Sequence, residues 1–207
     1  MSGSSVQKTR QYVRSTDRQY ISHRIFSKAF SPRQCERIIE SSRDLQPDAA
    51  LVSLGGASSD EHDLTRKARV SWIDQEENFL WIFEKLDKIA TAANKTYQFD
   101  LSGFTEDIQF THYDEPGSFF DWHQDGLQGE LSVRKLSAVV QLSAPDTYEG
   151  CDLEIFSGSL DETWWKSLVR QQGTVIVFPG FEYHRVAPLI SGSRFSLVCW
   201  FGGAPFR

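Results

Sequence analysis

The second half of the chain is a series of short apolar stretches that are separated by turn residues. The expected strands are Phe104–Tyr113, Lys135–Ser143, Leu153–Phe156, Thr174–Phe178, Tyr183–Pro188 and Arg194–Phe201. Pairs such as Pro116-Gly117 and Pro179-Gly180 lie between them, and these residues favour turns. Many short strands with tight turns are typical of an antiparallel jelly roll or barrel.

Helical signals come mainly before these strands. Ser31-Pro32-Arg33-Gln34 combines a hydroxyl N-cap, a proline at the first helical position and a capping-box glutamine, so a helix should begin there and run to about Leu45. A second helix is expected after an N-cap at Asp74, because apolar residues recur at helical spacing from Phe79 to Ala93. A further helical turn is expected at Asp161–Gln171. The pattern predicts a mainly β fold with supporting helices (α+β).

The length of 207 residues suits one domain with a single core. We expect a basic N-terminal arm over residues 1–19 and a single domain over residues 20–207. Within that domain, residues 20–100 would form a helical support and residues 101–207 the jelly-roll core. A short strand, Tyr20–Phe26, is expected where the domain begins.

Charge is unevenly distributed along the chain. The net charge of −6 gives no reason to expect a nucleic-acid partner. Residues 1–31 carry six Lys or Arg and one acid, a balance of +5 that leaves −11 for the rest. Such a start is compatible with an organelle-targeting leader or with a solvated arm, and the lack of an apolar face beside the charges favours the arm.

Apolar runs and cysteines indicate the compartment. We expect no membrane association, since the sequence contains no long apolar run and no secretory segment. Cys35, Cys151 and Cys199 are far apart and odd in number, which is typical of free thiols in a reducing compartment. The sequence therefore predicts a soluble intracellular, cytoplasmic protein. None of these patterns indicates its oligomeric state.

Two histidines and one aspartate have the spacing of a metal site. His123 and Asp125 are two residues apart, so in an extended segment their side chains project from the same face. His184 can supply a third ligand. Two histidines and one carboxylate on one face of an ion, with open positions opposite, is the arrangement of non-heme Fe(II) oxygenases. A second pair, His112 and Asp114, has the same spacing, but His112 shares its strand face with apolar residues and is expected to be a core or interface residue.

Arg194 is expected to point into the core near this site. On its strand it shares a face with Ser196 and Trp200, whereas the other face is wholly apolar apart from a cysteine. A buried arginine needs an anion, and a carboxylate fits its planar fork. Ser196 and the hydroxyl of Tyr113 could donate to the same carboxylate. A surface salt bridge is the alternative for Arg194.

With these residues in view, the sequence resembles the Fe(II)- and 2-oxoglutarate-dependent dioxygenases, and among them the prolyl 4-hydroxylase-like branch. The resemblance covers Phe104–Phe206. It is carried by Gln109–Tyr113, Pro116-Gly117, His123-x-Asp125, Tyr148-Glu149-Gly150, Leu153–Phe156, Gly173–Pro179, His184-Arg185-Val186 and Gly192-x-Arg194 through Trp200. It implies a double-stranded β-helix (jelly roll) core flanked by N-terminal helices. One departure is Cys151-Asp152, where a second glycine is usual after Gly150.

The resemblance also implies roles for single residues. His123, Asp125 and His184 would hold Fe(II), and Arg194 would bind the distal carboxylate of the cosubstrate 2-oxoglutarate. Tyr113 would hydrogen-bond that carboxylate. Gln141 and Leu153 would line the cosubstrate pocket, and Trp122, Trp200 and Arg185 are candidates for a substrate pocket. Leu51–Arg69 and Asp125–Arg134 are candidate lids.

The implied reaction uses Fe(II), 2-oxoglutarate and O2, with ascorbate as a candidate reductant, and hydroxylates an unactivated C–H bond while releasing succinate. Halogenation is disfavoured, because Asp125 occupies the position at which related halogenases have a small residue. Three functions remain open. The substrate could be a prolyl or similar residue in a peptide or protein, or a free amino acid or other small biosynthetic intermediate. Alternatively, the domain could be a non-catalytic jelly-roll binding module.

Overall fold

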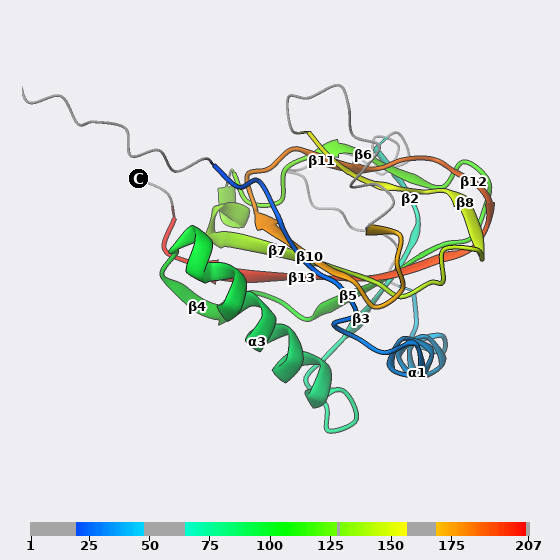
Figure 1. Cartoon of the computed structure of the whole chain (residues 1–207), viewed down its shortest axis with the longest axis horizontal. Coiled ribbons are helices and arrows are strands. Elements are labelled where there is room, and N and C mark those ends of the chain that lie inside the picture. Colours follow the sequence, from blue (N-terminus) through cyan, green and yellow to red (C-terminus); the bar gives the residue numbers. More distant parts are fainter. Residues whose placement is uncertain (1–19, 48–64, 128, 157–168, 206–207) are drawn as a thin grey trace, which may run out of the picture.

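Two antiparallel sheets face each other in the computed structural model, which describes residues 20–47, 65–127, 129–156 and 169–205 (Figure 1). The major sheet has the order β1 (Arg24–Phe26), β10 (Val175–Pro179), β7 (Arg134–Gln141), β13 (Arg194–Gly203), β5 (Ile108–Tyr113) and β3 (Arg69–Ile73), and β4 (Leu101–Phe104) pairs with the far end of β13. The minor sheet has the order β2 (Arg66–Lys67), β6 (Phe119–His123), β11 (His184–Val186) and β9 (Leu153–Ile155). The strands β8 (Tyr148–Gly150) and β12 (Leu189–Gly192) pair with each other. The predicted mainly β fold with supporting helices is confirmed.

Both described α-helices pack on the outer side of the major sheet. Figure 1 shows α1 (Pro32–Ser42) and α3 (Leu80–Tyr97) on one side of this sheet and β6 and β11 of the minor sheet on the other. The predicted capping box is present, because the Gln34 N–H donates to Ser31 Oγ (3.2 Å) and the Ser31 N–H donates to Gln34 Oε1 (2.9 Å). The helix ends at Ser42, somewhat before the expected Leu45.

Alternation along the central strands divides the core into two clusters. On β7, Leu136, Ala138 and Val140 pack with α1 and α3 outside the sheet. Val139 packs between the sheets, and it shares this inner face with Ser137 and Gln141. Polar side chains on the inner face of a buried strand are costly unless they have partners. The space between the two sheets is therefore where a binding site is expected.

Several element boundaries differ from the sequence-based prediction. The second helix does not begin after Asp74: its N-cap is Phe79, and the N–H groups of Phe79 and Leu80 donate to Glu76 O, so the acidic residues form a turn before the helix. The strand predicted at Phe104–Tyr113 is broken in two, since β4 and β5 pair with different ends of β13.

The candidate lid at Leu51–Arg69 is wrong for its last residues, because Arg66–Lys67 and Arg69 lie in β2 and β3. The rest of that segment lies outside the described residues, apart from Thr65 and Ala68. The arm at 1–19 and most of the predicted helix at 161–171 also lie outside them. In the second candidate lid, Gly129–Val133 form a 3-10 helix. Among the described helices, none has the length and apolarity needed to cross a membrane.

Gly173 tolerates no side chain. Its φ is +76°, and a Cβ would lie 1.9 Å from the carbonyl oxygen of Phe30, which precedes α1. Gly117 has a similar φ of +80° but open space around it, so it is a matched control. We expect Gly117→Ala to cost about 1 kcal/mol in the free energy of unfolding, and Gly173→Ala on the order of 3 kcal/mol, because backbone must also move. Urea unfolding of both variants measures the difference, and equal losses would contradict it.

Candidate metal centre and cosubstrate pocket

His123, Asp125 and His184 converge between the sheets. His123 ends β6 and His184 begins β11, and these two residues are register partners across the minor sheet. The Nε2 atom of His123 lies 3.5 Å from Asp125 Oδ1, and that of His184 lies 3.6 Å from Asp125 Oδ2. All three potential ligand atoms lie within 4.8 Å of one another. The expected three residues are thus brought close enough to share one ion.

The two imidazoles are oriented by backbone carbonyls. His123 Nδ1 lies 2.7 Å from Asp121 O, and His184 Nδ1 lies 3.0 Å from Glu182 O. A carbonyl only accepts hydrogen bonds, so Nδ1 is the protonated nitrogen in each neutral ring. Each Nε2 lone pair then faces the centre. Metal-binding histidines usually donate a hydrogen bond in this way from the ring nitrogen that does not bind the metal.

Asp125 is held as an ionised ligand. Ser137, on the inner face of β7, donates from Oγ to Asp125 Oδ2 at 2.6 Å. Burial opposes the charge, but the two histidines and the Ser137 hydroxyl outweigh it and hold the pKa of Asp125 well below its usual range. Burial and the neighbouring His123 lower the pKa of His184 to about 4, so its imidazole is neutral near pH 7. A charged carboxylate beside a neutral imidazole is a pair that can bind a divalent cation.

A β-bulge shapes the apolar surroundings of the cluster. The register of β6 and β11 shifts between His184 and Val186, so Phe120 and His123 lie on the same face, with ring centroids 3.6 Å apart. Phe178 of β10 contacts the His184 ring from the opposite sheet, at a centroid distance of 4.7 Å. Aromatic rings therefore flank both imidazoles.

Two of the candidate substrate-pocket residues are not brought to this cluster. Trp122 and Arg185 lie on the opposite face of the minor sheet from the histidines, and the guanidinium of Arg185 lies 4.9 Å from the centre of the Trp122 ring. Arg185 also pairs with Glu154 at 2.8 Å. Trp200 differs, because it is buried on the inner face of β13, where it is the register partner of Ser137.

Arg194 is buried on the inner face of β13, as expected. Only 2% of its surface is exposed, and its register partner is Tyr113 of β5, whose ring centre lies 5.4 Å from the guanidinium. Arg194 Nε donates to Gln141 Oε1 at 3.0 Å, and Gln141 Nε2 lies 2.9 Å from the hydroxyl of Tyr148. Arg194 Nη1 has no hydrogen-bond partner among the described residues. A buried guanidinium with an unused donor is a site for an anion.

The remaining pocket candidates surround this guanidinium. Ser196 is buried on β13 as the register partner of Gln141. Leu153 belongs to the apolar cluster between the sheets, which also contains Tyr113. Burial raises the pKa of Tyr113, so its phenol keeps its proton and can donate to an anion. The donor set fits a divalent metal at His123, Asp125 and His184 and a carboxylate at Arg194.

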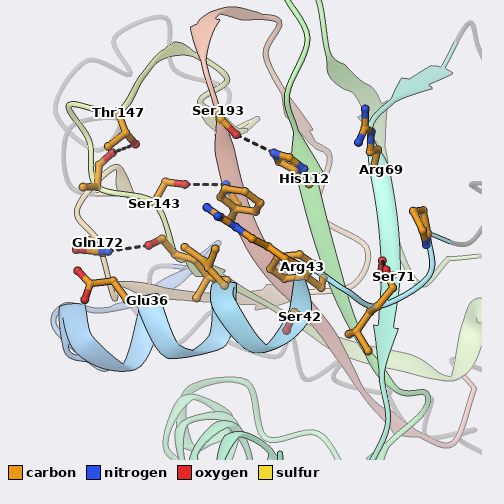
Figure 2. Close-up of a pocket in the computed structure, with 17 residues that line it drawn as sticks. Glu36, Ser42, Arg43, Arg69, Ser71, His112, Ser143, Thr147, Gln172 and Ser193 are labelled. Carbon is orange, nitrogen blue, oxygen red and sulfur yellow. Dashed lines mark hydrogen bonds between the residues drawn. The ribbon is translucent and has the colours of Figure 1, made fainter.

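His112 lies on the other face of the major sheet. Its ring stacks on Phe195 at 4.0 Å, and its Nε2 lies 2.7 Å from Ser193 Oγ. His112 and Ser193 line a cavity of about 700 Å³ between α1 and the sheet. Figure 2 shows His112 hydrogen-bonded to Ser193 on the sheet side of this cavity, with Glu36 and Arg43 on the side of α1. The expectation that His112 is a satisfied interface residue is confirmed.

Three contributors to the site were missed by reasoning from the sequence. Ser137 hydrogen-bonds Asp125, and Tyr148 hydrogen-bonds Gln141. The third contributor, Arg66 of β2, is buried between the sheets. Ser137 could have been found, because it shares strand parity with Gln141 inside an apolar stretch. Arg66 could not, since β2 has only two residues and follows a loop-like sequence.

Ser137→Ala is expected to weaken metal binding without unfolding the protein. The change removes the hydroxyl that orients Asp125, and loss of such a second-layer partner reduces metal affinity or activity about 10- to 100-fold. Protein is titrated with Mn(II) and desalted, and the metal content that it keeps measures the effect. Ser196→Ala, on the neighbouring strand, is the control and should leave Mn(II) affinity unchanged. Equal affinity in Ser137→Ala and the parent protein would show that Asp125 needs no such partner.

Comparisons with known proteins agree with this geometry. Residues 108–202 match the sequence model of the 2OG-Fe(II) oxygenase superfamily. A PKHD-type hydroxylase from Synechococcus sp. (strain CC9605) is 34% identical over 84 residues, which are 41% of this chain and 36% of that protein. The chain thus spans about a third of the length of the curated relatives that it matches.

Solved structures share the fold. A prolyl-4-hydroxylase from Pseudomonas putida superposes with a TM-score of 0.65 at 23% identity, covering 88% of this chain and 93% of that one. A prolyl hydroxylase from Trichoplax adhaerens, in complex with a peptide fragment of the hypoxia inducible factor oxygen degradation domain, has a TM-score of 0.64 at 14% identity and covers 87% of this chain and 83% of that one. The matched segment, residues 108–202, contains His123, Asp125, His184 and Arg194, and this part of the chain is similar to the 2OG-Fe(II) oxygenase superfamily.

Proposed function

We propose that this chain is an Fe(II)- and 2-oxoglutarate-dependent dioxygenase that hydroxylates an unactivated C–H bond of a prolyl or similar residue in a peptide or protein. The observation that carries the proposal is the convergence of His123, Asp125 and His184 on one point between the sheets. The unused donor of buried Arg194 supports a carboxylate cosubstrate beside that point. The prolyl hydroxylases that share the fold, one of them with a bound peptide, support the substrate class.

Each residue of the site has a separate task. The two Nε2 atoms and the Asp125 carboxylate would hold Fe(II) on one face and leave the opposite face open for the cosubstrate and dioxygen. Arg194, oriented by Gln141, would bind the distal carboxylate of 2-oxoglutarate through its fork, and Tyr113 would donate to the same group.

When bound, iron would supply the redox chemistry that couples the oxidation of 2-oxoglutarate to the oxidation of the substrate. One oxygen atom of O2 enters succinate as 2-oxoglutarate loses carbon dioxide, and the other enters the C–H bond of the substrate as a hydroxyl group. The protein must keep water away from this chemistry. Phe120 and Phe178, which contact the two histidines, are positioned to do so.

Succinate release tests the proposal. Protein supplied with Fe(II), 2-oxoglutarate, O2 and ascorbate should form succinate slowly without substrate and faster with peptides that contain proline, and the product should gain the mass of one oxygen atom. Stimulation by free amino acids but not by peptides would favour the small-molecule alternative. No succinate from protein that binds both Fe(II) and 2-oxoglutarate would favour the non-catalytic binding module.

We also propose a reducing intracellular compartment such as the cytoplasm. Cys35, Cys151 and Cys199 are all buried and free. Burial raises the pKa of each thiol, so these cysteines are expected to be unreactive packing residues. Alkylation of the native protein with iodoacetamide should therefore be slow, and rapid modification would argue against this assignment.

A further inference from the structure

Arg66 is a second buried arginine between the sheets, and its charge has no acidic partner within 4 Å among the described residues. Only 7% of its surface is exposed. Its Nη1 and Nη2 atoms lie 3.5 Å from Gln109 Oε1 and from Thr111 Oγ1, and its Nε has no partner in the described part of the chain. Good N–H···O bonds measure about 2.7–3.2 Å, so both contacts are long. A guanidinium with five donors is poorly satisfied here.

The position of Arg66 connects it to the metal centre. Arg66 and Phe120 are register partners in the minor sheet, and the guanidinium lies 4.7 Å from the centre of the Phe120 ring. That ring in turn stacks on His123. From the major sheet, Gln109 and Thr111 face Arg66, and they share the inner face of β5 with Tyr113. Arg66 therefore lines the same space as the proposed iron site, displaced from Arg194 along β5.

Charge counting separates the tasks of the two arginines. A ferrous ion brings two positive charges and Arg194 brings one, whereas Asp125 brings one negative charge and 2-oxoglutarate brings two. The charges of these four groups cancel. Arg66 then leaves one positive charge in excess at a buried position between the sheets, and such a charge needs an anion.

We propose that Arg66 binds a carboxylate of the substrate, so that the hydroxylated residue is a free amino acid or the C-terminal residue of a peptide. This inference rests on the proposed Fe(II)- and 2-oxoglutarate-dependent hydroxylation, and it takes in the free amino acid that was named above as the small-molecule alternative. It narrows the substrate class, because an internal residue of a peptide has no backbone carboxylate. The long contacts to Gln109 and Thr111 suit a side chain that turns toward a ligand when one is bound.

Binding of matched acids and amides tests the inference without turnover. Protein loaded with Mn(II) and the unreactive cosubstrate analogue N-oxalylglycine is titrated, by calorimetry, with free amino acids and their amides and with proline-ending dipeptides that have free or amidated C termini. We expect at least one free acid to bind about 30-fold or more tightly than its amide. Comparison of the amino-acid and dipeptide pairs distinguishes the two sources of the carboxylate.

Variants assign the preference to Arg66. Arg66→Gln should remove the difference between acid and amide, and Arg66→Lys should restore part of it, because a lysine keeps the charge but not the fork. Arg69→Gln is the control, since Arg69 lies on the next strand but is exposed and pairs with Asp114. Circular dichroism of each variant checks that it folds.

Four results would overturn the inference while leaving the proposed function intact. The first three are equal binding of acids and amides, failure of every free acid in the set to bind, and an unchanged preference in Arg66→Gln. A loss of N-oxalylglycine binding in Arg66→Gln would also overturn it, because Arg66 would then belong to the cosubstrate site. In contrast, absence of substrate-free succinate release by the parent protein would refute the proposed function itself.

Discussion

Replacement of His123 by alanine is expected to abolish Fe(II)-dependent succinate release and to weaken metal binding by about 100-fold or more. The Nε2 atom of His123 is one of three potential ligand atoms within 4.8 Å of one another, and the remaining two would leave an incomplete site. Metal content after Mn(II) loading and succinate release measure the two effects. We expect both to be lost together.

His112→Ala is the matched control for this experiment. His112 belongs to a His-x-Asp pair with the same spacing, but it stacks on Phe195 outside the major sheet. Its loss can reduce stability, because the ring is partly buried, yet it should leave Mn(II) content unchanged in folded protein. The opposite pattern, with metal binding lost in His112→Ala and kept in His123→Ala, would show that the site lies elsewhere.

Arg194→Met is expected to reduce affinity for 2-oxoglutarate by about 100-fold or more while Mn(II) affinity changes little. Removing one partner of a buried ion pair costs about 3–5 kcal/mol, because the other charge is left uncompensated. Arg194→Lys should recover only part of the loss, since an ammonium cannot donate both to Gln141 and in a fork to a carboxylate. Calorimetric titration of Mn(II)-loaded protein with 2-oxoglutarate measures both variants.

Arg69→Lys provides the control for the Arg194 variants. Arg69 is exposed and pairs with Asp114, so its replacement should leave 2-oxoglutarate affinity within error of the parent protein. If Arg194→Met binds 2-oxoglutarate as the parent does, Arg194 is a structural residue that serves Gln141 and Tyr148 only. The cosubstrate would then have to be held by another cation, and Arg66 is the next buried candidate.

The strand faces on which several candidate site residues lie could be predicted from the sequence, because strand parity is a local property. In β13, alternation alone placed Arg194, Ser196 and Trp200 on one face, and the structure has all three buried on the inner face. The same reasoning predicted that His112 and Tyr113 lie on opposite faces of β5, and they do face opposite sides of the major sheet. A capping box is equally local, and α1 begins where it predicts.

Other features depend on how strands pair, which a single sequence does not show. Asp125 lies beyond the end of β6, so its approach to His123 is not the simple consequence of extended spacing, and a bulge places Phe120 beside His123. The two-residue strand β2 exists only because it adds to the edge of β6.

The sequence by itself determined which side chains could form a metal and carboxylate site, since residue type and alternation are written into each strand. The tertiary structure alone decided that His184 lies opposite His123, that Ser137 reaches Asp125, and that Arg66 packs against Phe120 between the sheets. The reason is physical: these contacts join strands that are far apart in the chain, and only the register of the sheets and the packing between them bring such strands together.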